Sequence, residues 1–293
     1  MRLVITDSGL GGLSVCAALE HATRHRPGST RVHMTYVNAW PEDGRGYNDL
    51  PDTASRAAVF DNALGSIAAL RPDRLLIACN TLSILYPATR FSRTPPFPVV
   101  GIVDAGVSLF REALEAEPDS SIALLGTKTT IASGAHRDAL VASGVDHGRI
   151  VGVPCHGLAT VIERDIGGPG VGTLIGDCGR AVTAAHPSGN TVLVGLCCTH
   201  YGYVGDRIAR ELARALGRRV LALDPNQRMV RDVSAALGLV TGEGTAAEAS
   251  LVEVVSKVTL DERTCRGVAG LVRPTSPATA DALLAYRHVP SLF

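Results

Sequence analysis

The stretch that is most informative about fold and function is Val192-Leu193-Val194-Gly195-Leu196-Cys197-Cys198-Thr199-His200-Tyr201. Its first four residues form a short apolar run that is typical of a fully buried parallel strand. A second stretch has the same order, because Leu75-Leu76-Ile77-Ala78 is followed by Cys79-Asn80-Thr81. Ligands bind at the carboxyl ends of strands in open α/β sheets. We therefore hypothesise that Cys79 and Cys198, from separate halves of the chain, face one pocket as a two-thiol active site.

Similar apolar runs recur along the chain, each followed by a polar or glycine turn and then by a helical pattern. This spacing predicts βαβ units and an α/β fold with mainly parallel sheets. The residues after position 242 have no such regularity, and we expect them to be irregular. The runs lie at residues 3–6, 33–37, 75–78, 99–103, 122–125, 150–153, 192–195 and 220–223.

The charge balance of the sequence argues against nucleic acids and anionic membranes as binding partners. The chain has 293 residues, of which 46% are hydrophobic, and its 28 Lys and Arg balance 28 Asp and Glu. Arg218-Arg219 is the only close basic cluster, so we expect neither a nucleic acid nor an anionic membrane as partner. No apolar run reaches the length of a membrane span, and the chain turns polar by Asp7, too soon for a signal peptide. These features predict a cytoplasmic protein.

The seven cysteines are an odd number spread through a long chain. This distribution argues against a disulfide framework, and we expect free thiols. Cys16, Cys178 and Cys265 are interpreted as small core residues. Structural zinc sites usually have paired Cys-x-x-Cys or His-x-x-x-His spacing, which Cys79, Cys198 and His200 lack, so no metal is expected.

A glycine-rich turn, Asp7-Ser8-Gly9-Leu10-Gly11-Gly12, follows the first apolar run. Such turns bring backbone N–H groups close to a carboxylate or phosphate. Taken alone, the pattern favours a simpler interpretation, in which Asp7 caps the following helix. A thiol acts as a base only when its pKa is lowered, and we expect Asp7 and His200 to tune the two cysteines.

Four blocks together resemble the glutamate racemase family of the aspartate/glutamate racemase superfamily. They span residues 4 to about 235 in the family's order. The resemblance implies a cofactor-independent amino-acid racemase, built from two similar α/β domains with the active site in the cleft between them. The blocks are Asp7-Ser8-Gly9-Leu10-Gly11-Gly12-Leu13-Ser14-Val15, Ala78-Cys79-Asn80-Thr81, Gly126-Thr127-Lys128-Thr129-Thr130-Ile131 with Ser133-Gly134, and Cys198-Thr199-His200-Tyr201.

The resemblance also implies roles for individual residues. Cys79 would deprotonate the D-isomer and Cys198 the L-isomer, assisted by Asp7 and His200 respectively. Glu163 matches, by a loose alignment, a family carboxylate near the second cysteine. The substrate's amino and carboxylate groups would be bound by Ser8, Asn80, Thr81, Thr130 and Thr199, with Gly46 and Tyr47 from the carboxylate loop.

The resemblance extends to domain organisation and biology. The first domain would comprise residues 1–100 and 213–293, and the second residues 101–212, with the proline-rich stretch 93–98 near the first boundary. Family members are often dimers, so a homodimer is the assembly implied. A glutamate racemase would supply D-glutamate for peptidoglycan.

The sequence departs from the family at the carboxylate loop. The family has Pro-Tyr-Gly there, whereas residues 38–49 contain Gly46-Tyr47 in a different order, the only Trp, and Arg45. Arg45 either pairs with a carboxylate or is an exposed loop residue. The proline that the family has after Thr-His-Tyr is Gly202 here.

Other cysteines admit two interpretations. Cys197 either forms a vicinal disulfide with Cys198 or, as we favour, points to the opposite side of the strand. Cys155 and His156 either line the pocket or lie in a surface turn.

Three classes of function stay open. The first is an amino-acid racemase for glutamate or a similar substrate. The second is another superfamily enzyme, such as an aspartate or hydantoin racemase, an arylmalonate decarboxylase or a maleate isomerase. Two cysteines argue against the decarboxylase, which needs one thiol. The third is a non-catalytic binding protein that keeps the pocket.

Overall fold

The computed structural model describes residues 1–24, 32–238 and 250–293. The chain forms two compact units: residues 1–102 with 229–293 make unit 1, and residues 103–228 make unit 2. The return to unit 1 lies between Arg228 and Met229, later than the position 212/213 expected from the sequence. The reason is that the strand at residues 219–223 pairs with the strand at 191–197 and belongs to unit 2.

Unit 1 contains a sheet of six parallel strands. The strands are β1 (Arg2–Asp7), β2 (His33–Asn38), β3 (Arg74–Ile77), β4 (Val99–Gly101), β9 (Leu251–Ser256) and β10 (Arg287–His288). Their order is β10-β9-β2-β1-β3-β4. Thr6 of β1 lies opposite Ile77 of β3, so the residues that follow, Asp7 and Ala78-Cys79, leave the sheet at the same edge.

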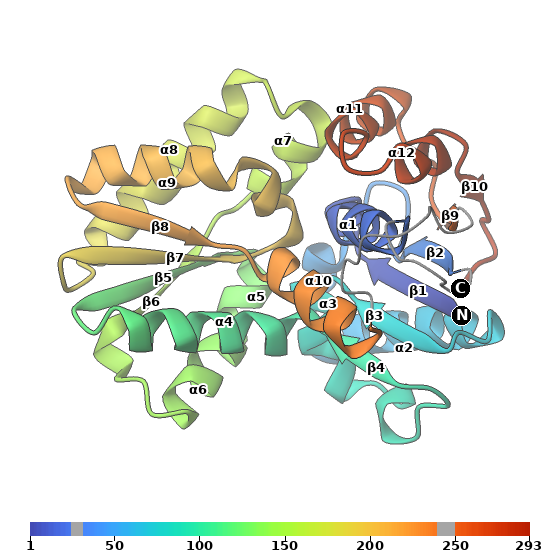
Figure 1. The fold of residues 1–293 in the computed structure, drawn as a ribbon, viewed down its shortest axis with the longest axis horizontal. Helices are drawn as coiled ribbons and strands as arrows, with labels where there is room; N and C mark the ends of the chain where they lie inside the picture. Colours follow the sequence, from blue (N-terminus) through green and yellow to red (C-terminus); the bar gives the residue numbers. More distant parts are fainter. Residues whose placement is uncertain (25–31, 239–249) are drawn as a thin grey trace. The chain divides into compact units, whose positions relative to one another are not determined.

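Helices cover both faces of this sheet (Figure 1). One face packs on α2, whose Phe60, Leu64 and Ile67 are buried together with Val4, Leu75 and Ile77 of the sheet. The side chain of Asp52 caps α2 by accepting from the Ser55 N–H. The helical segments are α1 (Leu13–Arg24), η1 (Tyr47–Asp49), α2 (Thr53–Ala69), α3 (Asn80–Leu85), η2 (Tyr86–Ala88), η3 (Phe91–Arg93), α11 (Glu262–Val272) and α12 (Pro277–Leu284).

Unit 2 contains a sheet of four parallel strands. The strands are β5 (Ser120–Gly126), β6 (Ile150–Pro154), β7 (Thr191–Cys197) and β8 (Arg219–Leu223), in the order β6-β5-β7-β8. Every residue of the central strands β5 and β7 is buried. This burial explains the apolar run within each strand, because both faces of a parallel sheet are covered by helices.

Alternate residues of β7 contribute to two separate cores. Val192, Val194 and Leu196 belong to the core under α7, α8 and α9, whereas Leu193 and Cys197 belong to the core under α4 and α6. Figure 1 shows these helices on opposite sides of the sheet. The helical segments are α4 (Ile102–Ala116), α5 (Lys128–Ala132), α6 (Ala135–Ala142), η4 (His147–Arg149), α7 (Leu158–Asp165), α8 (Pro169–Ala184), η5 (Thr199–Val204), α9 (Gly205–Leu216) and α10 (Pro225–Ala236).

The eight strands expected from the apolar runs are all present, and the prediction of an α/β fold with parallel sheets is confirmed. The prediction of an irregular C-terminal region is wrong. Residues 251–288 form β9, α11, α12 and β10, with Asp261 and Ser276 capping the two helices. The glycines Gly242 and Gly244 lie outside the described residues. Among the described helices, none is both long and apolar enough to cross a membrane.

The cysteines differ from the expectation of free thiols at one place. Cys155, just after β6, and Cys178, on α8, form a disulfide with a Cα–Cα distance of 5.8 Å. Both residues lie in the core that α7, α8 and α9 form with the sheet. Only the tertiary packing brings them together, since they are 23 positions apart in the sequence. Cys16, Cys79, Cys197, Cys198 and Cys265 are free and buried.

Candidate active site

Asp7 ends β1 and holds the glycine-rich turn that leads into α1. Its buried carboxylate accepts hydrogen bonds from the backbone N–H groups of Ser8 and Gly12, each at 2.6 Å. A Cβ atom added to Gly12 would lie 2.9 Å from Asp7 Oδ2, so glycine permits this close approach. The capping interpretation of Asp7 therefore describes its contacts well, and these contacts also fix the carboxylate beside the end of β3.

Cys79 lies just beyond β3 and caps α3. Its sulfur is 3.2 Å from Ser8 Oγ and accepts from the Leu82 N–H at 3.5 Å. The side chain is 5% exposed. The predicted site residues Asp7, Ser8 and Cys79 thus come together at one edge of the unit 1 sheet. A sulfur at the N-terminus of a helix is also where the backbone N–H groups favour negative charge.

The electrostatic surroundings of Cys79 favour the protonated thiol. Burial, and then the negative charge of Asp7, raise the pKa of Cys79 well above its ordinary value, while hydrogen bonds from Ser8 and Leu82 oppose the shift. The expectation that Asp7 tunes Cys79 toward a thiolate is therefore wrong, because a neighbouring carboxylate disfavours a second negative charge.

Tyr47 packs beside Cys79 in the core under α2. Its ring meets Phe60 edge-on, with the ring centroids 6.5 Å apart. Its buried hydroxyl has no hydrogen-bond partner within the described part of the chain. Burial, and then the charge that Cys79 carries as a thiolate, raise the pKa of Tyr47. A buried phenol next to a sulfur is a potential donor to a thiolate.

The rest of the carboxylate loop has a different arrangement. Gly46 donates its N–H to Asp49 at 2.7 Å, and a Cβ there would lie 2.7 Å from the ring of Trp40. Trp40 therefore packs directly on the Gly46 turn. Arg45 is exposed and forms an isolated bridge with Glu42, which matches the interpretation of Arg45 as a surface loop residue.

Asn80 and Thr81 form the first turn of α3 and are both buried. They follow Cys79 directly, so their backbone N–H groups belong to the helix N-terminus at which the sulfur lies. An N-terminal helical turn binds carboxylates. The structure thus gathers four of the predicted unit 1 residues, Ser8, Cys79, Asn80 and Thr81, around one helix start.

The second thiol, Cys198, directly follows β7 and precedes η5. Its sulfur lies 3.8 Å from His200 Nδ1, and His200 Nε2 lies 2.5 Å from Glu163 Oε2 on α7. His200 is 9% exposed and Glu163 23%. The loosely aligned Glu163 therefore contacts the imidazole and not the sulfur. A carboxylate, an imidazole and a thiol form one hydrogen-bonded chain, the arrangement that orients and charges a histidine beside a thiol.

The contacts of His200 favour its protonated form. Burial alone lowers its pKa, but hydrogen bonds to Cys198 and Glu163, together with the charges of these two groups, raise the pKa well above its ordinary value. The tuning role expected for His200 toward Cys198 stays a prediction. The two thiols thus have opposite neighbours: a carboxylate beside Cys79 and a cationic imidazole beside Cys198.

Thr199 directly follows the second thiol, and Thr130 lies in the first turn of α5, which follows the neighbouring strand β5. Thr130, in the first turn of α5, lies with its hydroxyl 3.0 Å from Thr127 Oγ1. Its methyl group faces Gly126, which lies opposite Cys197 in the sheet. The Thr199 carbonyl accepts from Asn226 Nδ2 at 2.9 Å. Sequence reasoning missed Asn226, although Asp224-Pro225-Asn226 follows β8 just as polar residues follow the other strands.

Cys197 and Cys198 point to opposite sides of the sheet, as expected. Cys197 belongs to the core under α4 and α6, and Cys198 to the core under α7, α8 and α9. Cys155 is buried and accepts through its carbonyl from the hydroxyl of Tyr201 at 3.1 Å, whereas His156 is exposed in the turn. Among the described residues, no group of three or more metal-ligating side chains gathers.

Comparison with known proteins identifies the family of this chain. Residues 5–233 match the model of the Asp/Glu/Hydantoin racemase family. The glutamate racemase of Granulibacter bethesdensis is 31% identical over 239 residues, which cover 80% of this chain and 77% of that protein.

Solved structures share the fold. The glutamate racemase of Campylobacter jejuni superposes with a TM-score of 0.69 at 19% identity, covering 94% of this chain and 97% of that one. That of Francisella tularensis, solved in complex with D-glutamate, has a TM-score of 0.64 at 17% identity, covering 98% and 95%. The family match spans both half-sites, and the resemblance seen in the sequence is confirmed: this chain belongs to the Asp/Glu/hydantoin racemase family, in the group of the glutamate racemases, and is an isomerase that racemises amino acids.

Proposed function

We propose that this chain is a cofactor-independent racemase of glutamate, and that Cys79 and Cys198 exchange protons with opposite faces of the α-carbon. The observation that carries the proposal is the contrast between the two thiols. Cys79 lies beside the Asp7 carboxylate, and Cys198 lies beside His200, which Glu163 contacts in turn. Glutamate is the substrate named for its relatives, including the protein from Granulibacter bethesdensis.

Racemisation by two bases needs a resting enzyme with one thiol and one thiolate, and the different neighbours of Cys79 and Cys198 support such a state. One thiol must be deprotonated to remove the α-proton, and the other must be protonated to return one. The raised pKa of Cys79 favours the protonated thiol there, and the proposal assigns the role of base to Cys198, whose sulfur lies beside His200. In this state the enzyme is ready for the L-isomer: Cys198 takes the proton from one face and Cys79 delivers a proton to the other.

The carbanion that forms between these two steps needs preorganised donors, because no cofactor acts as an electron sink in this proposal. In unit 1, Ser8, Asn80 and Thr81 and the N-terminus of α3 would serve the substrate's polar groups. In unit 2, Thr130 and Thr199 would do so. In the reverse direction Cys79 must lose its proton, and the buried Tyr47 hydroxyl is available to donate to the resulting thiolate.

The Trp40 ring over Gly46 is the feature of this chain that bears on substrate choice. It occupies the loop in which family members bind a substrate carboxylate. Aspartate and other amino acids are therefore tested beside glutamate, as alternative substrates of the same two-thiol chemistry.

The test is exchange of the α-proton in D₂O, followed by proton NMR over a panel of D- and L-amino acids. Folded and reduced protein should remove the α-signal of glutamate and form the opposite enantiomer. Cys79→Ser and Cys198→Ser should each lose about 10²- to 10⁴-fold in racemisation. Cys197→Ala is the matched control, since that thiol faces the other core, and it should racemise normally.

Two results contradict the proposal. Absence of exchange with every amino acid of the panel would exclude amino-acid racemisation. Equal turnover by wild type and both serine variants would exclude the two thiols as the bases.

A further inference from the structure

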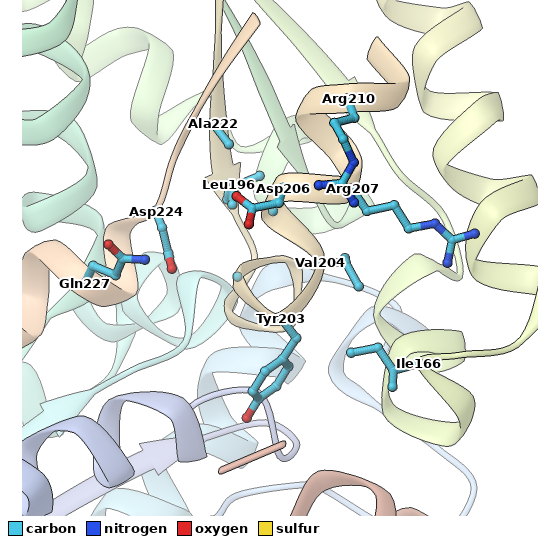
Figure 2. Close-up of a pocket in the computed structure, with 12 residues that line it drawn as sticks. Ile166, Leu196, Tyr203, Val204, Asp206, Arg207, Arg210, Ala222, Asp224 and Gln227 are labelled. Atoms are coloured by element: carbon cyan, nitrogen blue, oxygen red, sulfur yellow. The ribbon is translucent and has the colours of Figure 1, made fainter. Parts of the chain in front are cut away.

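A cavity of about 420 Å³ lies in unit 2, over η5 and the start of α9 (Figure 2). None of the side chains assigned to the reaction lines it. Its floor is apolar, with Leu196, Val204 and Ala222. The volume falls in the range of small-molecule sites, about 300–1,000 Å³, which typically combine an apolar lining with a few polar groups.

Two arginines of α9 give this cavity a cationic side. Arg207 and Arg210 both line it, and they lie three positions apart on one face of the helix. Within the described ranges, neither guanidinium has an ion-pair partner within 4.0 Å. By contrast, Arg214, one turn further along α9, pairs with Glu211 at 3.0 Å. Guanidinium groups without an ion-pair partner are suited to an oxyanion, and two of them line this cavity.

The opposite side of the cavity is acidic and polar. Figure 2 shows Asp224 and Gln227 across from the two arginines, with Asp206 between them. Asp224 follows β8 and accepts from the Asn226 N–H at 2.9 Å. Burial raises the pKa of Asp224 to about 6. Asp224 would therefore offer a ligand a hydrogen-bonding carboxyl group, on the side of the cavity opposite the cationic arginines.

Gly202 makes room for this acidic side. A Cβ at Gly202 would lie 2.9 Å from Asp224 Oδ2 and 3.1 Å from Asn226 Nδ2. A larger residue would therefore displace these side chains from beneath η5. The acidic side of the cavity therefore depends on glycine at position 202.

We propose that this cavity binds a small molecule whose phosphate or carboxylate group is held by Arg207 and Arg210 and whose uncharged polar end meets Asp224. The anionic group of the ligand would be the ion-pair partner of the two arginines, and the apolar floor would bury the middle of the ligand. The site lies wholly in unit 2 and uses none of the side chains assigned to the reaction.

Its lining is continuous with the second half-site. Gly202, Tyr203 and Val204 line the cavity and end the same η5 segment that begins with Thr199 and His200. Asp224 is also two hydrogen bonds from Thr199, because Asn226 donates its backbone N–H to Asp224 and its side-chain N–H to the Thr199 carbonyl. We therefore expect occupancy to change the rate of racemisation, a second step that rests on the proposed function.

Binding is tested without any activity measurement. The probes are pyrophosphate and citrate, titrated calorimetrically into the whole protein at low ionic strength. At least one should bind with a dissociation constant below about 1 mM, and more weakly as salt is added. Stronger binding of pyrophosphate identifies phosphate as the recognised group, and stronger binding of citrate identifies carboxylate.

Matched variants assign the site. Arg207→Gln and Arg210→Gln should each weaken binding about tenfold or more. Arg214→Gln, on the same helix, should leave it unchanged. Absence of binding by both probes would overturn the proposal. Equal affinity of wild type and an Arg207→Gln/Arg210→Gln double variant would also overturn it, because the anion would then bind elsewhere.

The coupling is read from the ratio of racemisation rates with and without the bound probe. This ratio should differ from one by about fivefold in the wild type and in Arg214→Gln, and it should equal one in the double variant. Asn226→Ala should keep the binding and lose the rate effect. A probe that binds at the arginines without changing the rate would refute the coupling alone, whereas an enzyme inactive on every amino acid would refute the proposed function alone.

Discussion

Replacing Glu163 by Gln tests the chain that links this carboxylate to Cys198, because Gln keeps the shape of the side chain and removes its charge. Glu163 Oε2 lies 2.5 Å from His200 Nε2. Hydrogen bonds to charged groups contribute about 1.5–3 kcal/mol, which corresponds to a loss of about tenfold to about 150-fold in kcat/KM. Glu163 is 23% exposed, so solvent screening places the expected loss in the lower half of this range.

The pH dependence of Glu163→Gln gives a second readout. In the wild type, burial lowers the pKa of His200, but hydrogen bonds and charges from Cys198 and Glu163 raise it well above its ordinary value. The variant lacks one of these raising contributions, so its imidazolium loses its proton at lower pH. The alkaline limb of the kcat/KM profile should therefore move to lower pH.

The assay follows racemisation in both directions. Enantiomers have equal free energies, so kcat/KM must fall by the same factor for D- and L-glutamate. The two directions differ in the deuterium isotope effect at the α-carbon, which should rise more for the L-isomer, whose proton Cys198 removes. Glu211→Gln, an exposed carboxylate paired with Arg214, is the control. An unchanged pH profile with less than about threefold loss in kcat/KM would refute this role of Glu163.

Three further predictions concern single residues. Asp7→Asn should lower the pKa of Cys79 by removing the second-largest cause of its elevation, seen as faster alkylation of Cys79 at a given pH by peptide mass spectrometry; an unchanged alkylation profile would contradict this. Gly12→Ala should lower the free energy of unfolding by about 1–3 kcal/mol, because its Cβ would lie 2.9 Å from Asp7 Oδ2, whereas Gly65→Ala, with open space around it, should leave urea stability equal or higher. Cys197→Ala should cost about 1 kcal/mol of stability with normal racemisation, and loss of activity in this folded variant would show that Cys197 takes part in the reaction.

The strands were predictable because each is a short apolar run bounded by turns, and because both faces of a parallel sheet are buried. The polar residues after β1 and β3 were therefore predictable as neighbours at one edge of the first sheet, and those after β7 as residues at the edge of the second sheet. The direction in which Asp7 acts was missed. Its position in the sequence reveals a neighbour of Cys79, but the sign of its effect follows from a negative charge close to a buried sulfur.

Contacts between distant segments could not be predicted from local patterns. Glu163 meets His200 across 37 positions, and Cys155 meets Cys178 across 23. In the C-terminal region, β9 is half exposed and lacks a fully apolar run, so its pairing with β2 has no local signal. The end of unit 2 was misplaced for a related reason, since the pairing of β8 with β7 decides it.

The pairing of β9 with β2 has a consequence for the order of events during synthesis. Leu251 of β9 lies opposite His33 of β2. One edge of β2 therefore stays unpaired until β9 is synthesised, about 200 residues later. At about 5–20 residues per second this delay lasts roughly 10–40 s. Unit 2 is one continuous segment, residues 103–228, so its synthesis is finished before that of unit 1, which also needs residues 229–293. The nascent first sheet therefore exposes an unpaired strand edge throughout that interval, and such an edge is a template for pairing with another chain.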